Sequence, residues 1–309
     1  MLTVYRSSPR GLDEVPQPEA GCWADAVNPT AEEVDRLKAL GVPAHFLKHA
    51  LDLGERPRVE HEQNTTLIVL RLPVARGTEA EVPYQTLPLG IILTDRMIVT
   101  ACRVQENLAH MLLARQQESV STTQHSRFLL QLFFGVAETY LEQLAEINEA
   151  VEALEDRLEQ SLQNREVLGL LRYQKSLTYF ITALRSNRLM LERLRRSHLF
   201  EGAPQDLELL EDVLTETEQA IEITGIASDI LSQMMDAFAS IISNNLNVVM
   251  KFLAVVTVVL SVPTLIASLY GMNVGLPGEE HPLVFVAIVA VSAAISLLLL
   301  WLFRRKNWL

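Results

Sequence analysis

Cysteine is scarce in this sequence: Cys22 and Cys102 are the two among 309 residues. Neither belongs to a CxxC pair, so we expect both to be reduced, buried residues without a metal or redox role. The sequence also lacks an HExxH motif, a GxSxG motif and a Walker-type phosphate loop. Its many glutamates recur at the spacing of a solvated helix face. These absences argue against an enzyme.

Hydrophobic residues are unevenly distributed along the chain. They make up 49% of it and the net charge is −12, yet residues 1–250 have the character of a soluble, acidic protein. Two long apolar runs follow at 252–270 and 283–303, and the second carries no charge. At 1.5 Å per helical residue, each run reaches roughly 30 Å, the thickness of a bilayer core. We therefore expect two membrane-spanning helices.

Lys and Arg residues lie before the first of these runs and after the second, and the connector between the runs has none. Lys251 precedes the first run, and Arg304, Arg305 and Lys306 follow the second, whereas the connector at 272–282 has no Lys or Arg. The positive-inside rule then places both termini in the cytoplasm and the connector outside. No signal peptide is recognisable at the start, so the large N-terminal part is expected to remain cytoplasmic. The expected location is a bacterial inner (plasma) membrane, crossed twice.

The first part of the chain has the mixed pattern of an α/β domain. Thr30 and Glu33 form a predicted capping box at the start of a helix. Short apolar stretches indicate strands, and the last two are joined as a hairpin. These strands are predicted at 66–72, 87–93 and 97–101, and a polar loop is predicted at 74–85.

The next part is predicted to be helical. Apolar residues recur every three or four positions from about residue 124, and a second helix follows at about 165–196. After a break at Gly202-Ala203-Pro204, one helix of roughly 100 Å is predicted over about 205–270. The predicted segments are 1–123, a cytoplasmic α/β domain; 124–203, an acidic helical hairpin; 204–250, a stalk helix; 251–271, a first, pore-lining span; 272–282, a periplasmic or extracellular loop; 283–303, a second span; and 304–309, a basic cytoplasmic tail.

One face of the long helix is polar or small, although the other faces of its membrane part are apolar. Its residues alternate spacings of four and three, the 3.5-residue repeat that keeps a stripe turned towards a supercoil axis. Several copies packed around that axis would line a wet pore. The alternative is a two-span anchor whose small and hydroxylated residues pack helix against helix. The stripe comprises Asp236, Ser240, Ser243, Asn247, Met250, Ala254, Thr257, Ser261, Thr264, Ser268 and Gly271.

The end of the first span carries a specific motif. It closes with Tyr270-Gly271-Met272-Asn273, and a second span follows after a short loop. This arrangement resembles the CorA family of divalent metal-ion transporters, of the two-transmembrane Gly-Met-Asn type. The similarity extends over 244–273 and, more weakly, to Asn28-Pro29-Thr30 and 55–60. The resemblance implies an α+β cytoplasmic domain with a long stalk helix and two transmembrane helices, assembled as a funnel-shaped homopentamer.

The resemblance also implies the cargo. Magnesium (Mg2+) is the usual ion of the family, with cobalt (Co2+) or nickel (Ni2+) as further candidates, and it also serves as a regulatory ligand. The relatives called ZntB carry zinc (Zn2+), and the loop Gly275-Leu276-Pro277-Gly278 is somewhat like theirs. The expected partners are further copies of the chain, the lipid bilayer and divalent cations, and no nucleic acid.

The same resemblance assigns the outer mouth. Tyr270, Gly271, Met272 and Asn273 correspond to a selectivity filter. A ring of Asn273 amides would accept hydrogen bonds from the waters that magnesium sheds reluctantly, without binding too tightly for release. Glu279 and Glu280 would form an acidic ring there that concentrates cations, or they simply solvate a loop.

Positions further along the pore are also assigned by the resemblance. Asn247, Met250 and Leu253 correspond to pore positions, where apolar rings would gate by dewetting. Asp236 corresponds to an acidic ring at the cytoplasmic exit. Asp212 corresponds to a regulatory magnesium ligand between subunits, because hard oxygen ligands from adjacent chains can share one cation. For each, ordinary packing or solvation is the alternative.

Three functions stay open at this stage. The first is a pentameric magnesium importer driven by the membrane potential, since a divalent cation crossing 100 mV gains about 4.6 kcal/mol. The second has the same architecture but moves zinc, in either direction and with or without proton coupling. The third is a membrane-anchored coiled-coil scaffold that transports nothing. Cobalt hexaammine mimics hydrated magnesium and should block a pore for that ion, which distinguishes the first function from the second. Replacement of Asn273 should leave a scaffold intact, which distinguishes the third function from both.

Overall fold

The computed structural model describes residues 1–8, 11–103, 108–114, 120–160, 164–200, 204–272, 275, 283–306 and 308. Contacts divide the chain into two compact units, Met1–Gln233 and Met234–Leu309. The division falls inside one continuous helix, α6 (Pro204–Tyr270). The sheet and the helical hairpin, predicted as separate segments, therefore belong to one unit.

The first unit is built on a seven-stranded sheet with the strand order β2-β1-β3-β7-β6-β5-β4. β3 and β7 run parallel, and the other neighbouring strands run antiparallel. The three predicted strands are confirmed as β5, β6 and β7. The strands are β1 (Leu2–Ser8), β2 (Gly11–Glu14), β3 (Cys22–Val27), β4 (Arg58–Glu62), β5 (Thr65–Ala75), β6 (Tyr84–Leu93) and β7 (Met97–Cys102).

The polar loop predicted at 74–85 is shorter in the structure. Val74 pairs with Gln85 and Ala75 pairs with Tyr84, so β5 and β6 extend into the predicted loop from both ends. Val74 and Tyr84 are buried. Burial of these two apolar side chains favours a longer hairpin over a solvated loop.

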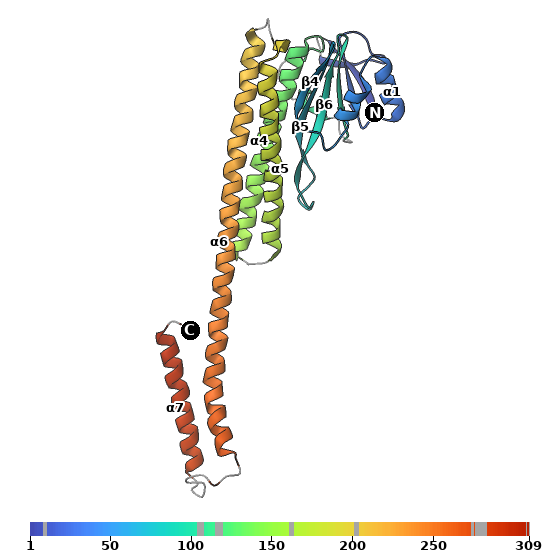
Figure 1. Ribbon diagram of the computed structural model, residues 1–309. Helices are drawn as coiled ribbons and strands as arrows, with labels where there is room; N and C mark the ends of the chain where they lie inside the picture. The colour runs from blue at the N-terminus through green and yellow to red at the C-terminus, as the bar shows by residue number, and fades with distance from the viewer. Residues whose placement is uncertain are drawn as a thin grey trace. The chain divides into compact units, whose positions relative to one another are not determined.

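Two short helices cover one face of the sheet (Figure 1). α1 (Ala31–Ala39) begins with the predicted capping box, in which Thr30 and Glu33 each accept the other's backbone N–H, at 3.3 and 2.8 Å. α2 (Ala44–Ala50) packs directly on β6. Cys22 and Cys102 are reduced and buried, as predicted.

A long antiparallel hairpin of α4 (His125–Gln160) and α5 (Asn164–Arg195) packs on the other face of the sheet (Figure 1). Both α5 and α6 begin and end within one residue of their predicted positions. Arg71 of β5 fastens the hairpin to the sheet, because its carbonyl accepts from Tyr140 Oη at 3.0 Å and from Asn187 Nδ2 at 2.8 Å. Further helical elements are α3 (Leu108–Ala114), a 3-10 turn (His198–Phe200) and α7 (Val284–Arg305).

We expect Gly90→Ala to destabilise the first unit. A Cβ at this position would contact the Ala50 side chain and lie 2.7 Å from Ala50 Cα. Either α2 or β6 would have to move, at a cost of about 1–3 kcal/mol. The matched control is Gly225→Ala in α6, where nothing lies within 4 Å of the added Cβ and alanine is the better helix former. The melting temperature should fall for the first variant alone; an unchanged value for Gly90→Ala would contradict the close contact.

A buried carboxyl, that of Asp25 on β3, lies in the interior of the same unit. Thr100 Oγ1 donates to Asp25 Oδ1 at 2.6 Å and accepts from Trp23 Nε1 at 2.8 Å. Asp25 Oδ2 has no hydrogen-bond partner among the described residues. Loss of hydration on burial raises the pKa of Asp25 to about 6, even though the Thr100 hydrogen bond acts to lower it.

This raised pKa predicts that stability falls as the pH rises from about 4 to about 6. The folded chain holds the Asp25 proton more tightly than the unfolded chain, so the stabilising contribution is present in acid and is lost above the folded pKa. Its size is at most about 3 kcal/mol. Asp25→Asn should flatten this dependence of the melting temperature on pH. The same pH slope in wild type and variant would exclude Asp25 as its source.

Candidate functional site

Helix α6 carries the predicted stripe from Asp236 to Ser268, and Gly271 lies just beyond the end of the helix. At 100° per residue, the positions from Asp236 to Ser268, apart from Leu253, fall within a sector of about 120° around the helix axis. All of the candidate residues on this helix and at its end are exposed in the single chain. They are Asp236, Ser240, Ser243, Asn247, Met250, Leu253, Ala254, Thr257, Ser261, Thr264, Ser268, Tyr270, Gly271 and Met272.

Helix α7 packs on the opposite side of α6. Val255 of α6 is 1% exposed and Ser292 of α7 is 8% exposed. Ser296 Oγ of α7 donates to the Val259 carbonyl at 3.4 Å. Val255 and Val259 lie about 120–160° around the α6 axis from Ser261. The second helix of this unit therefore covers one side of α6 and leaves the stripe uncovered.

The contact between α6 and α7 uses small residues that sequence reasoning did not single out. Ser292 and Ser296 stand four residues apart on one face of α7, within an otherwise apolar run. Small, hydroxylated residues let helices approach closely in an apolar medium. The four-residue spacing of these serines was the available signal. Within one chain, Ser296 of α7 supplies the hydrogen bond between the two helices, and a packing role for the α6 hydroxyls between copies stays an alternative.

The stripe hydroxyls are oriented by their own helix. Thr257 Oγ1 donates to the Leu253 carbonyl and Thr264 Oγ1 to the Leu260 carbonyl, both at 2.8 Å, and Ser261 Oγ donates to the Val258 carbonyl at 3.1 Å. Because each hydroxyl proton is used within the helix, the free lone pairs of the oxygen remain as acceptors. Waters that coordinate a cation through their oxygens donate hydrogen bonds outwards, so they require hydrogen-bond acceptors around them. These hydroxyls and Ser268 line an open groove of about 720 Å³ along α6, and the rest of its lining is apolar: Val256, Leu260, Val262 and Leu265.

The described part of the motif, Tyr270 to Met272, lies at the end of α6. The helix ends at Tyr270, the Gly271 N–H donates to the Ala267 carbonyl at 3.0 Å, and the Met272 N–H donates to the Leu269 carbonyl at 3.4 Å. Gly271 and Met272 thus form a turn directly after the helix. Asn273, Glu279 and Glu280 lie outside the described residues, so their assignments stay predictions.

The predicted regulatory ligand, Asp212, lies on the part of α6 that belongs to the first unit. It is exposed, as are its neighbours Glu208 and Glu211, and Glu211 pairs with Arg195 at 3.1 Å. Within the described ranges, no group of three or more His, Cys, Asp or Glu side chains is arranged to hold a metal ion. The regulatory role of Asp212 therefore stays a prediction.

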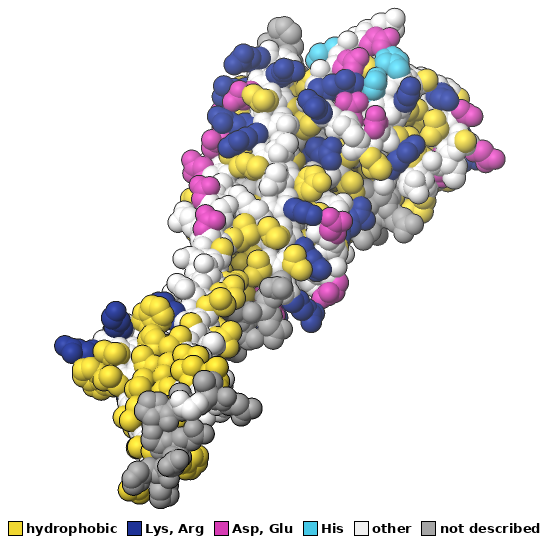
Figure 2. All heavy atoms as spheres, turned by 60° about the horizontal axis from the view of Figure 1, so that its bottom comes forward, with side chains coloured by type: hydrophobic (Ala, Val, Ile, Leu, Met, Phe, Trp, Pro, Cys, Tyr) yellow, Lys and Arg dark blue, Asp and Glu magenta, His cyan; other side chains and the backbone are white. Residues whose placement is uncertain are grey.

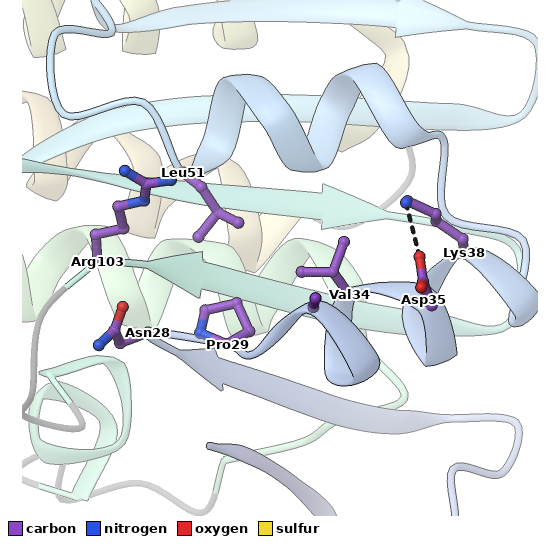
Figure 3. Close-up of a pocket in the computed structure, with 8 residues that line it drawn as sticks. Asn28, Pro29, Val34, Asp35, Lys38, Leu51 and Arg103 are labelled. Carbon is purple, nitrogen blue, oxygen red and sulfur yellow. Dashed lines mark hydrogen bonds and ion pairs between the residues drawn. The ribbon is translucent and has the colours of Figure 1, made fainter.

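A surface cavity of about 350 Å³ lies beside α1 in the first unit (Figure 3). Lys38 and Asp35 face each other across an ion pair of 2.8 Å on its rim. Val34, Pro29 and Leu51 supply apolar lining, and Arg103 adds a second cation. With charges of both signs and an ion pair already closed, this cavity offers no converging set of ligands for a divalent cation.

Exposed apolar side chains dominate the second unit (Figure 2). The two helices that could span a membrane have apolar windows of mean hydropathy 2.4 and 2.7, and 6% of each window is buried. A core helix of a soluble protein would bury most of such a window. The two predicted spans are thus consistent with a lipid environment.

Comparison with known proteins gives one consistent result. A family model described as CorA-like Mg2+ transporter protein matches residues 18–305. The cobalt/magnesium transport protein CorA of Methanocaldococcus jannaschii is 29% identical, over 93% of this chain and 91% of that protein. The zinc transport protein ZntB of Photorhabdus laumondii is 22% identical, over 82% of this chain and 77% of its own length.

A solved structure shares the complete fold. The structure of the CorA magnesium transporter from Methanocaldococcus jannaschii matches with a TM-score of 0.83 and 26% identity, covering 100% of this chain and 99% of that one. The predicted combination of a mixed sheet domain, a long helix and two apolar helices is confirmed by this match.

Solvent access tests which side of α6 meets water. We expect Ser261→Cys, in a membrane-embedded protein, to react with a charged, membrane-impermeant thiol reagent, because a stripe that faces a wet pore is hydrated. Val255→Cys is the matched control, since α7 covers that side. Background labelling should be low because Cys22 and Cys102 are 0% and 1% exposed. Equal protection of both new cysteines would indicate a dry helix contact at the stripe.

Proposed function

This chain belongs to the CorA-like Mg2+ transporter protein family, a family of transporters and not of enzymes, and we propose that it carries Mg2+ through a pore lined by α6. The observation that supports this proposal most is the uncovered stripe. A polar face along a helix that is otherwise apolar must meet water or another polar face within a bilayer.

The pore requires several copies of the chain. One α6 supplies one wall, and α7 packs on its far side, so the path is completed by the α6 helices of other protomers. We propose a homopentamer, funnel-shaped in its cytoplasmic part, on the resemblance to the family. The 3.5-residue repeat of the stripe suits a ring of helices that supercoil around a common axis.

Selection would occur at the outer mouth without full dehydration of the ion. Magnesium keeps most of its waters when bound. A ring of Asn273 amide oxygens would accept hydrogen bonds from those waters, and Glu279 and Glu280 would raise the local cation concentration. Below the mouth, Thr264, Ser268 and the other stripe hydroxyls offer further acceptors.

The inner half of the path would contain the gate. Met250 and Leu253 form apolar rings that close by dewetting when the helices approach, and Asn247 and Asp236 line the exit. Asp212 would bind Mg2+ between subunits and favour the closed state, because loss of the cation leaves like charges facing each other. This arrangement would make uptake respond to internal magnesium.

The direction of flow follows from the proposed orientation. Lys251 and the tail residues Arg304, Arg305 and Lys306 favour cytoplasmic placement of both termini. The membrane is then the bacterial inner membrane, and an inside-negative potential of 100 mV supplies about 4.6 kcal/mol for entry of a divalent cation. Cobalt or nickel, with a similar charge and hydration, would share the path.

A second candidate cargo is zinc. The similarity to a zinc transport protein named ZntB, at 22% identity, favours keeping it. Zinc prefers nitrogen and sulfur ligands, whereas the stripe offers oxygen acceptors. Cobalt hexaammine should block a pore for hydrated magnesium and leave a zinc path unaffected. A scaffold without transport is the alternative of another class.

Ion flux into proteoliposomes tests the proposal. Wild-type protein should take up Mg2+ at a rate that rises with an inside-negative potential. Asn273→Ala should lower that rate roughly tenfold or more, since loss of about 1.4 kcal/mol of selective binding corresponds to a factor of ten. Asn245→Ala is the matched control, because this asparagine lies on α6 and away from the stripe.

The other outcomes have distinct meanings. Zinc uptake without magnesium uptake would assign the chain to the zinc branch. An equal rate for Asn273→Ala and wild type would remove the filter from the proposal. Absence of flux for both ions, with a folded and oligomeric protein, would favour the scaffold.

A further inference from the structure

Two histidines stand one helical turn apart on α2, in the first unit. His45 and His49 are at positions i and i+4, so they project from the same side of the helix. Their ring centroids are 6.4 Å apart. Both side chains are partly exposed, His45 at 46% and His49 at 37%. Figure 2 shows histidine and acidic side chains next to each other on the surface of the molecule.

Each imidazole is held by a glutamate from outside the helix. His45 Nε2 lies 2.6 Å from Glu62 Oε2 at the end of β4, and His49 Nδ1 lies 3.3 Å from Glu55 Oε2 in the segment before β4. A carboxylate at one ring nitrogen fixes the tautomer and makes the other nitrogen a better ligand. The nitrogens left over are His45 Nδ1 and His49 Nε2.

We propose that His45 and His49 form a binding site for a divalent transition-metal ion of borderline softness, namely Co2+, Ni2+ or Zn2+. Glu62 and Glu55 accept the N–H of the opposite ring nitrogens, and water completes the coordination. Imidazole nitrogen suits these ions, whereas Mg2+ prefers oxygen ligands. The site is thus separate in chemistry from the oxygen-lined path along α6.

The observed spacing of the rings is close to what such an ion requires. With metal–nitrogen distances of about 2.0–2.1 Å, tetrahedral coordination brings two imidazole centroids to about 5 Å apart. From 6.4 Å, a combined side-chain movement of roughly 1 Å closes the pair. Partly exposed side chains on one helical turn can make such a movement by small χ rotations.

The surrounding charges favour a cation. Glu55 is 14% exposed at its side chain, so its charge is poorly screened by solvent. Arg58 faces Glu60 at 3.1 Å and lies further from Glu55, at 3.8 Å. Arg71 Nη1 also donates to the Glu55 carbonyl, at 2.9 Å, so the negative charge beside the pair comes mainly from Glu62, which lies 2.6 Å from His45.

His61 provides a matched control on the same strand as Glu62. Its Nδ1 lies 2.8 Å from Thr66 Oγ1. Successive residues of a strand point to opposite faces, so His61 points away from the face that carries Glu60 and Glu62. A variant at His61 changes the histidine count without touching the proposed site.

Cobalt absorption of the full-length, untagged protein in detergent tests the site. With Mg2+ in large excess to fill oxygen sites, Co2+ should add visible ligand-field bands that saturate at one ion per chain. His45→Ala and His49→Ala should each weaken this binding at least tenfold, and Glu62→Gln should weaken it roughly 10–100-fold. His61→Gln should bind as wild type does. Since both rings are partly exposed, melting temperatures should stay near the wild-type value.

Several results would overturn the assignment. Bands that survive in His45→Ala and His49→Ala, or that excess Mg2+ abolishes, would show that the cobalt is bound elsewhere. X-ray absorption of the Zn2+-loaded wild type needs no variant: imidazole scattering at about 2.0–2.1 Å supports the site, and an oxygen-only shell rejects it. Neither readout depends on transport, so failure here leaves the proposed pore untouched, and failure of the flux experiment leaves this site untouched.

Discussion

The second unit depends on one constraint: α6 has two chemically different sides, and α7 can cover one of them. The hydrogen bond from Ser296 to the Val259 carbonyl, together with the burial of Val255 and Ser292, shows which side is covered. The remaining side carries hydroxyl oxygens whose free lone pairs find no hydrogen-bond donor in hydrocarbon. A lone chain in a bilayer would leave that side exposed, which supports the proposed association of several copies around water.

The oxygen chemistry of that side also limits what the proposed pore would conduct. The hydroxyls of Thr257, Ser261 and Thr264 donate to carbonyls of their own helix. Their oxygens can therefore accept hydrogen bonds from the waters around a cation. Such a surface stabilises a hydrated ion moderately, as conduction requires. The histidines of α2 have the opposite preference, for ions that accept nitrogen ligands. If both proposals hold, one chain would separate two classes of divalent cation by ligand type.

Sequence pattern predicted the helical part of the fold well and the sheet less well. Apolar periodicity extends over many turns in α5 and α6, so their ends were predicted within one residue. β3 is six residues long and buried on both faces, so it lacks the alternation that marks a strand. The stripe could be predicted from spacing. The pairs of His45 with Glu62 and of His49 with Glu55 could not, because a loop and a strand bring them together.

Electron cryomicroscopy of the protein in lipid nanodiscs with Mg2+ would show whether α6 helices surround a common axis. We expect a closed ring of five chains, with Ser261, Thr264 and Ser268 of every copy facing the axis and α7 outside. A ring or dimer in which the stripe is buried in a dry contact between helices, with no water-filled path along α6, would contradict it.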